Sequence, residues 1–235
     1  MTILLPVLAG IGCILSFLLM LKDADNQKKT RENFSEQTAE QDGQIALLWE
    51  GGIPKSCWIY SAVCLLVTVA IGVVLPNLYP GNGIWGNIKR IVLLFVIWPL
   101  AYIDYKTMRI PNLFVVYGLI CRAVLLLFEL FLGHTAVWNY LATEAIAAVA
   151  LLLAAVLCGL VVKNGIGFGD MKLFVVLGLF LGLTGIWSAI FLALLISFVI
   201  ALFVLITKKK SRKDAIPFGP ALVIGTYLSI CLSGM

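Results

Sequence analysis

Two aspartates, Asp104 and Asp170, are the residues of this chain whose type and surroundings best suit chemistry. Each borders an apolar run and lies in a short polar segment. Two carboxylates that lie close together cannot both ionise easily, so they share a proton and titrate as a unit. One is then a base that can take a proton from an attacking water, while the other is an acid that can protonate a carbonyl oxygen. This pattern predicts acid–base hydrolysis, with Asp104 and Asp170 as its catalytic residues.

The polar segment that follows Asp104 predicts a tight turn between two helices. It reads Asp104-Tyr-Lys-Thr-Met-Arg-Ile-Pro111-Asn112. Pro111 disfavours helix at Ile110, and Asn112 can cap the helix that follows. We therefore expect the chain to leave one helix, turn and enter the next, with Asp104 held at the turn.

Glycines precede Asp170 in the segment Gly165-Ile-Gly167-Phe-Gly169-Asp170-Met-Lys172. Glycine permits positive backbone dihedrals and the close approach of another chain, and Asp170 is expected where a helix begins. Lys172 has two open interpretations. Its ammonium group is either a partner of a substrate or of the carboxylates, or it extends to the membrane interface.

The composition excludes an ordinary soluble domain. The sequence of 235 residues is 62% hydrophobic and 12% charged, and its mean hydropathy is +1.06. A soluble domain needs about a quarter charged residues. Continuous runs of roughly 20 apolar residues can cross a bilayer as helices, so we predict an all-α protein, a polytopic transmembrane helical bundle with about eight membrane segments. The predicted segments are Ile3–Leu21, Cys57–Leu75, Ile91–Ile103, Leu113–Leu132, Tyr140–Val162, Met171–Leu183, Ile186–Ile206 and Ile216–Leu232.

The distribution of Lys and Arg predicts the orientation of this bundle. With the N-terminus outside, the cytoplasmic connections hold most basic residues, including the cluster Lys208–Lys213, which attracts anionic lipid. Lys89 and Arg90 are the exception on the outer side. Topology explains the net charge of +5, so no nucleic-acid partner is expected. We predict a multi-pass protein of the plasma (cytoplasmic) membrane, with both aspartates at its cytoplasmic edge.

A few ionisable residues lie away from the two aspartates. Arg122 and Glu129 share one face of an apolar segment and are about 10 Å apart along the helix axis, too far to pair directly without help from other helices. A functional role is the default for such residues, but structural contacts between helices are the favoured interpretation. Glu144 is expected to be solvated near the outer face. His134 is expected in an outer loop, without a catalytic or metal-binding role.

The six cysteines are interpreted as small core residues. They form no Cys-x-x-Cys pair, and no histidine cluster lies near them. We therefore expect no zinc or other metal site, no disulfide framework and no cofactor. The cysteines are Cys13, Cys57, Cys64, Cys121, Cys158 and Cys231.

A third motif, Ile216-Pro-Phe-Gly-Pro-Ala221, opens the last apolar segment. Together with Asp104 and Arg109-Ile-Pro-Asn112, and with Gly167-Phe-Gly169-Asp170-Met-Lys172-Leu, it makes the chain resemble the type IV prepilin peptidases. These are membrane aspartic proteases that share a Gly-x-Gly-Asp signature with preflagellin peptidases and, more remotely, presenilins. The resemblance runs from the third apolar segment to the C-terminus. It implies that the two aspartates are the catalytic pair.

The resemblance also implies a substrate class. A short basic leader would be cleaved, after a glycine, from pilin-like or pseudopilin precursors on the cytoplasmic face. The partners would be these single-span membrane proteins and the lipid bilayer. The chain then divides into a first transmembrane span (1–22), a short polar cytoplasmic loop (23–56) and a membrane-embedded peptidase core (57–235).

The loop 23–56 departs from the family pattern. Larger bacterial members are similar in having a cytoplasmic region after the first span, but theirs usually carries two Cys-x-x-Cys pairs that bind zinc and accompanies N-methylation of the trimmed product. Residues 23–56 contain no cysteine. Zinc is therefore not expected, and methyltransferase activity is doubtful.

Three other functions fit parts of the same pattern. A Gly-x-Gly-Asp protease that cuts within a transmembrane helix would use the same pair, and mapping the cleavage site separates it from a leader peptidase. A proton-coupled transporter would use buried carboxylates and glycine-interrupted segments, and it predicts ion-coupled uptake into vesicles. A non-catalytic assembly factor is a third alternative, against which the intact motifs argue.

Overall fold

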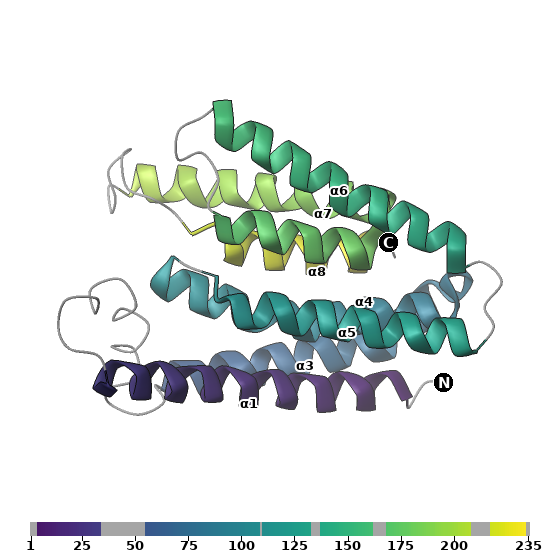
Figure 1. Cartoon of the computed structure of the whole chain (residues 1–235), viewed down its shortest axis with the longest axis horizontal. Coiled ribbons are helices and arrows are strands. Elements are labelled where there is room, and N and C mark those ends of the chain that lie inside the picture. The colour runs from purple at the N-terminus through teal and green to yellow at the C-terminus, as the bar shows by residue number, and fades with distance from the viewer. Residues whose placement is uncertain are drawn as a thin grey trace.

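The computed structural model describes residues 4–33, 55–108, 110–132, 137–161, 168–207 and 217–233. Within these ranges the chain is helical and contains no β-strand, which confirms the predicted all-α class. The helices cross the molecule between the same two ends (Figure 1). They are α1 (Leu4–Asn33), α3 (Lys55–Leu78), the short 3-10 helix η1 (Pro80–Asn82), α4 (Gly83–Thr107), α5 (Asn112–Phe131), α6 (Val137–Val161), α7 (Phe168–Ile206) and α8 (Gly219–Ser233).

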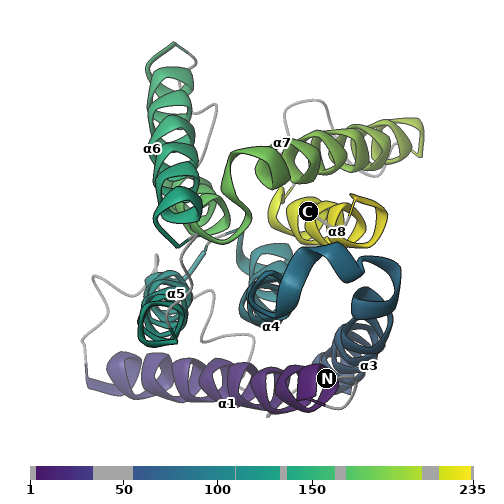
Figure 2. The same cartoon turned by 90° about the vertical axis from the view of Figure 1, so that its right-hand side faces the viewer.

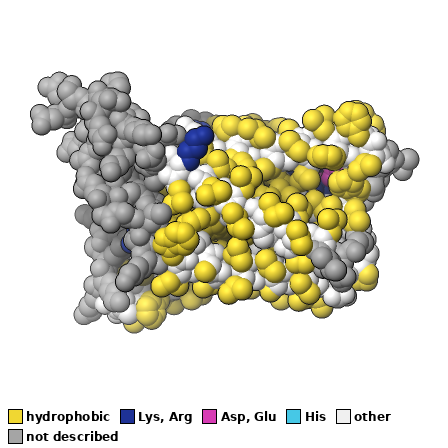
Figure 3. Space-filling view, turned by 90° about the horizontal axis from the view of Figure 1, so that it is seen from below, with side chains coloured by type: hydrophobic (Ala, Val, Ile, Leu, Met, Phe, Trp, Pro, Cys, Tyr) yellow, Lys and Arg dark blue, Asp and Glu magenta, His cyan; other side chains and the backbone are white. Residues whose placement is uncertain are grey.

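The outer surface of the bundle suits a lipid environment. Among the described helices, six are long and apolar enough to cross a membrane, and α8 is a shorter apolar helix. Large hydrophobic side chains are exposed on them, for example Phe198 and Phe203 in α7 and Leu66 in α3. Figure 3 shows one face covered largely by hydrophobic side chains, with few charged groups. Because apolar patches of this extent are unfavourable in water, the structure agrees with a multi-pass membrane protein.

Helix α7 is divided at Gly182. A straight helix of its 39 residues would be about 58 Å long, nearly twice the thickness of the hydrocarbon core. Gly182 has φ 65° and ψ −175°, which no helix accommodates, and it separates a first portion (168–181) from a second portion (183–206). Figure 1 shows the two portions as separate ribbons, joined near the end of the bundle where the chain termini lie. The predicted boundary between Met171–Leu183 and Ile186–Ile206 falls at this break.

Helix α4 is the central element of the bundle. It contacts α1, α3, α5, α7 and α8, which surround it in Figure 2. Most of its side chains are buried, from Asn87 near its start to Asp104 near its end. The predicted segment Ile91–Ile103 was therefore too short. The helix begins earlier because Asn87 and Lys89 are buried among protein groups and do not face lipid.

Helix α1 continues beyond the predicted first span. Its apolar part is Leu4–Lys22, and the helix extends to Asn33. The beginning of the predicted polar loop 23–56 is therefore helical, while residues 34–54 lie outside the described residues. Buried residues of α1, such as Leu5 and Met20, belong to the same hydrophobic core as α4.

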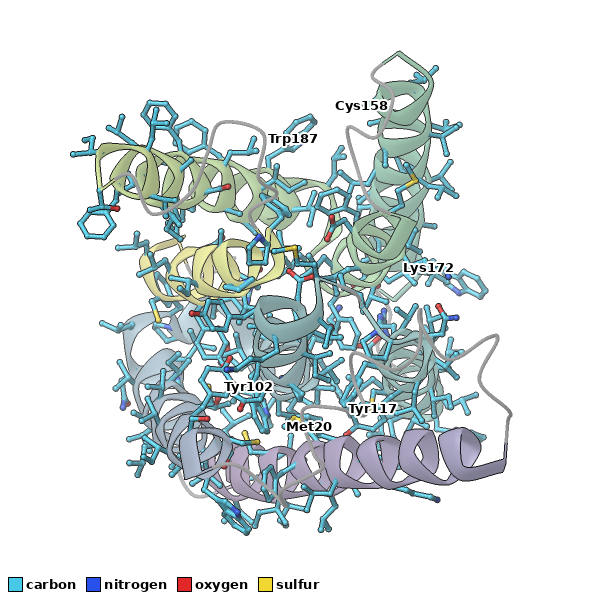
Figure 4. The ribbon with its side chains drawn as sticks, turned by 90° about the vertical axis from the view of Figure 1, so that its left-hand side faces the viewer. Met20, Tyr102, Tyr117, Cys158, Lys172 and Trp187 are labelled. Atoms are coloured by element: carbon cyan, nitrogen blue, oxygen red, sulfur yellow. The ribbon has the colours of Figure 1, made fainter. Side chains whose placement is uncertain are left out.

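Aromatic side chains hold the last turns of α4 against α3. The Tyr60 hydroxyl donates a hydrogen bond to the backbone carbonyl of Trp98 at 2.9 Å. The rings of Tyr60 and Tyr102 lie 5.4 Å apart, and the Tyr102 hydroxyl is 3.2 Å from the Ser56 hydroxyl. Figure 4 shows Tyr102 inside the bundle. Since Asp104 follows two residues after Tyr102, these contacts restrict its position.

The cysteines lie in the described helices, and none of the six is in a disulfide. Cys13 and Cys57 are buried, as expected for core residues, whereas Cys158 is exposed on α6. The interpretation as a core residue was wrong for Cys158, because only one side of α6 packs against the rest of the bundle and its other side faces outward.

Helices α6 and α7 approach each other through small residues. A Cβ atom added to Gly178 would lie only 2.9 Å from the Cα of Ala148. We therefore expect Gly178→Ala to lower the free energy of unfolding by about 1–3 kcal/mol, since overpacking forces the helices apart. Reversible unfolding in detergent micelles measures this. Gly10→Ala is the matched control, because no atom lies within 4 Å of the added Cβ. Equal losses of unfolding free energy for Gly178→Ala and Gly10→Ala would contradict the close approach of α6 and α7.

Candidate active site

Asp104 lies in the last turn of α4 and is buried, with 5% of its surface exposed. Its Oδ2 accepts a hydrogen bond of 2.7 Å from the backbone N–H of Gly219, the first residue of α8. The carboxyl group therefore satisfies one of the unpaired N–H groups at a helix N-terminus, where the helix dipole favours a negative group. A Cβ on Gly219 would lie 2.6 Å from Asp104 Oδ2 and 2.9 Å from Asp104 Cβ, so only glycine permits this approach.

The chain turns directly after Asp104, as predicted. Helix α4 ends at Thr107 and α5 begins at Asn112, and Pro111 between them is extended with φ −64° and ψ 135°. Met108 has φ 51°, and its N–H donates to the Asp104 carbonyl at 2.8 Å. The expectation that Asn112 caps α5 was wrong. Asn112 is the first helical residue, Pro111 occupies the capping position without a side-chain bond, and the Asn112 side chain has another partner.

The left-handed backbone at Met108 predicts a gain of stability on substitution by glycine. A residue with a Cβ costs about 1–2 kcal/mol in this region, whereas glycine enters it freely. Met108→Gly is expected to raise the free energy of unfolding in detergent by about 1 kcal/mol. Met108→Val is expected to lower it, because a β-branched side chain crowds this backbone further. A glycine variant less stable than the parent protein would show that the Met108 side chain matters more than its backbone.

Helix α7 begins at Phe168, and Asp170 lies in its first turn, as predicted. Two contacts hold this turn against the α4–α5 turn. A Cβ on Gly169 would lie 3.0 Å from the Ile110 Cβ, so backbone and side chain touch there. The Lys172 ammonium donates to the Asn112 side-chain oxygen at 2.7 Å, and Figure 4 shows Lys172 reaching toward α5. Sequence reasoning missed this bond, since neither interpretation of Lys172 included Asn112.

A third contact joins α7 to the start of α8. The rings of Phe174 and Phe218 lie 6.2 Å apart and meet edge to face. Phe174 follows Asp170 by one helical turn, and Phe218 directly precedes the glycine that binds Asp104. The ends of three segments therefore meet: the α4–α5 turn, the start of α7 and the start of α8. Both aspartates lie at this end of the bundle, which is opposite the chain termini in Figure 1.

The contact between Asp104 and Gly219 was missed by sequence reasoning. The motif Ile216–Ala221 could have indicated this contact. Membrane insertion alone does not require a glycine between two prolines at the start of an apolar segment. Several predicted residues lie outside the described residues: Gly165, Gly167, Arg109, His134 and Lys208–Lys213. Across the described ranges, no three His, Cys, Asp or Glu side chains are grouped as metal ligands.

A second polar group, the ionic cluster, lies deeper in the bundle. It consists of Lys89, Arg122, Glu129 and Glu144, each at least 91% buried. Arg122 pairs with Glu144 and, at 3.4 Å, with Glu129, while Lys89 lies 2.7 Å from Glu144 and 3.6 Å from Glu129. Lys89 precedes Asp104 by about 22 Å along α4, so the cluster is separate from the aspartates.

The ionic cluster corrects one expectation from the sequence. Glu144 is buried, at 3% exposure, because it meets two cations from other helices and is not solvated. Arg122 and Glu129 lie 3.4 Å apart in a cluster that also contains Lys89 of α4 and Glu144 of α6, which fits the expectation that they pair only with help from other helices. The expected structural contacts between helices are present, since the cluster joins α4, α5 and α6.

Comparison with known proteins finds relatives of one name. The chain is 28% identical to a prepilin leader peptidase/N-methyltransferase of Aeromonas salmonicida over 199 residues, which are 79% of this chain and 64% of that protein. It is 29% identical to the protein of the same name from Aeromonas hydrophila over 200 residues, which again are 79% of this chain and 64% of that protein. A Bacillus subtilis protein of that name is 32% identical over 83 residues, which are 35% of this chain and 33% of that protein.

The chain thus spans less than two thirds of the length of the Aeromonas relatives. No solved structure gives a significant match. A family profile, that of the type IV leader peptidases, matches residues 91–206. This range contains both aspartates, most of α4 and all of α7. Residues 91–206 of this chain are therefore similar to the type IV leader peptidase family.

Proposed function

We propose that this chain is a membrane-bound aspartic endopeptidase that removes the short basic leader of type IV prepilin-like precursors, with Asp104 and Asp170 as its catalytic pair. The observation that carries the proposal is the convergence of three chain segments around Asp104. Gly219 binds its carboxyl group, Phe218 beside that glycine packs on Phe174, and Phe174 is one turn beyond Asp170. The family match over residues 91–206 supports the peptidase activity.

The proposed reaction is hydrolysis of one peptide bond by two aspartates that share a proton. One carboxylate takes a proton from a water, whose oxygen adds to the carbonyl carbon of the scissile bond, while the other carboxyl protonates the carbonyl oxygen. When the tetrahedral adduct collapses, the carbon–nitrogen bond breaks, the proton held by the first aspartate passes to the leaving amine, and a hydroxyl group of the adduct returns a proton to the second aspartate. The buried position of Asp104 limits access of bulk water to this step.

The proposed substrate approaches as a single apolar helix in the bilayer. Its leader junction would lie at the end of the bundle where both aspartates lie. We assign this end to the cytoplasmic face, on the distribution of Lys and Arg in the sequence. We further propose that the core for this reaction is residues 57–235, and that methyl transfer, which the names of the relatives include, is not performed by this chain. The support for the last point is a loop 23–56 without cysteine.

Co-expression with candidate precursors tests the proposed function. Each precursor has a basic leader, a glycine at the junction and an apolar helix, and a second set has the glycine replaced by a bulky residue. Mass spectrometry is expected to find leader removal after the glycine, in the first set only, without the mass of an added methyl group. Cleavage inside the apolar helix would favour the intramembrane protease. Uncut precursors beside a folded, inserted protein would reject peptidase activity on this substrate class.

A further inference from the structure

The break in α7 at Gly182 changes the backbone geometry at the end of the first helical portion. In a continuous helix the carbonyl of Leu179 would accept from the N–H four residues later, but Gly182 interrupts that pattern. Instead, the Arg122 Nε donates to the Leu179 carbonyl at 2.9 Å. Arg122 therefore caps the C-terminal end of the helical portion whose N-terminal turn carries Asp170.

The ionic cluster holds Arg122 in this position. Its guanidinium group bonds to Glu144 of α6 and Glu129 of α5, and Glu144 also binds Lys89 of α4. Glu144 lies directly at the break, since its Cγ would be 3.7 Å from a Cβ on Gly182. The four charges cancel in pairs, but burying them costs more than a hydrophobic contact of the same size. Stability alone therefore does not explain why a membrane bundle contains them.

The portion 168–181 is held tightly along its sides as well as at its end. Gly178 lies against Ala148 of α6, and Gly118 of α5 lies against Val176. Such close contacts transmit displacement, because packed interiors deform little. The portion is about 20 Å long, so a shift at its capped end reaches Asp170 at the other end as a rigid-body movement.

We propose that Arg122 is a positioning residue for Asp170: by capping Leu179 at the Gly182 break, it sets the axial position of the helical portion 168–181 relative to Asp104. The inference rests on the proposed peptidase function and adds to it a residue that acts through α7 without touching substrate. Its charge partners keep the guanidinium directed at the break. A misplacement of about 1 Å at reacting groups lowers a rate by about 100-fold, so a small axial shift has a large effect.

Arg122→Lys is the first test. Lysine keeps the charge balance of the cluster, but a single ammonium cannot reproduce the planar set of donors that joins Leu179, Glu129 and Glu144 at once. We expect kcat for precursor cleavage to fall by about 10- to 100-fold with KM within about twofold, since the substrate-binding surface is unchanged. An unchanged kcat would overturn the proposal.

Two further variants separate positioning from stability. Glu129→Gln removes a charge but keeps a side-chain oxygen that can accept the hydrogen bond from Arg122. Arg122 therefore keeps its bond to Leu179, and the variant is expected to lower stability but not kcat of the folded protein. The double variant Arg122→Met with Glu144→Leu replaces one ion pair by apolar groups, which is often neutral or stabilising. It is expected to remain folded and yet be slow. If Glu129→Gln slows cleavage as much as Arg122→Lys, or if the double variant is as fast as the parent protein, the cap on Leu179 does not position Asp170.

A cross-linking measurement is independent of cleavage. In membranes, the pair Ile110→Cys and Gly169→Cys places two thiols close together, because a Cβ added to Gly169 would lie 3.0 Å from the Ile110 Cβ. A disulfide can form there after a small adjustment. Oxidation is expected to be several-fold slower when Arg122→Lys is added, because the start of α7 has moved. If the parent protein cuts no precursor, the proposed function fails, and this rate still decides the inference: a slower rate supports it and an equal rate overturns it.

Discussion

Replacing either Asp104 or Asp170 by asparagine is expected to abolish leader removal. Asparagine has the same shape but can neither hold nor release the shared proton, so the rate should fall by at least about 10,000-fold, as it does when one member of a catalytic group is lost. The Asp104→Asn variant should still fold, because its amide oxygen can accept the hydrogen bond from Gly219 that the carboxylate accepts in the parent protein. Mass spectrometry of co-expressed precursors measures the result.

The loss of cleavage can be assigned to the missing carboxyl group only if both variants are folded. Membrane insertion and thermal unfolding in detergent should be similar for the parent protein and both variants. Asp23→Asn is the matched control, since it makes the same chemical change in the polar extension of α1. Cleavage at a rate within about tenfold of the parent protein by either site variant would exclude that aspartate from the reaction, because a lost catalytic group costs far more.

Gly219→Ala is expected to have the second largest effect. Its Cβ would lie 2.6 Å from Asp104 Oδ2, so the carboxyl group or the start of α8 must move. We expect the cleavage rate to fall by about 100-fold, because a displacement of this size removes the geometry that two carboxylates need. The free energy of unfolding should fall by about 1–3 kcal/mol, through overpacking and the weakened hydrogen bond to a buried carboxyl. Steady-state cleavage and unfolding in detergent measure the two effects.

A coupled variant identifies the cause of this effect. If the carboxyl group of Asp104 is what the new methyl group displaces, the loss of stability caused by Gly219→Ala should be smaller in an Asp104→Ala background, where that carboxyl is absent. Gly10→Ala again serves as the control for adding a methyl group to a helical glycine with open space around it. Full activity of Gly219→Ala would show that Asp104 does not need its observed position.

Local patterns in the sequence identified the elements of the site. Pro111 disfavours helix at the residue before it, and a glycine-rich stretch before an apolar run marks a helix start, so the turn after Asp104 and the place of Asp170 in α7 were predictable. The all-α membrane fold was predictable from the length and continuity of the apolar runs. Each of these signals acts over a few neighbouring residues, and the chain carries them before it folds.

Only the tertiary structure decided which distant residues meet. Gly219 binds Asp104 across 115 positions of sequence, and no local preference of either residue implies that bond. The same holds for Glu144, whose sequence position near a segment end indicated solvation, whereas burial against Lys89 and Arg122 depends on how α4, α5 and α6 pack. Charge and type are properties of a residue, but burial and partnership are properties of the packed bundle. The sequence by itself therefore determined what each segment could become, and packing decided which side chains hold the two aspartates in place.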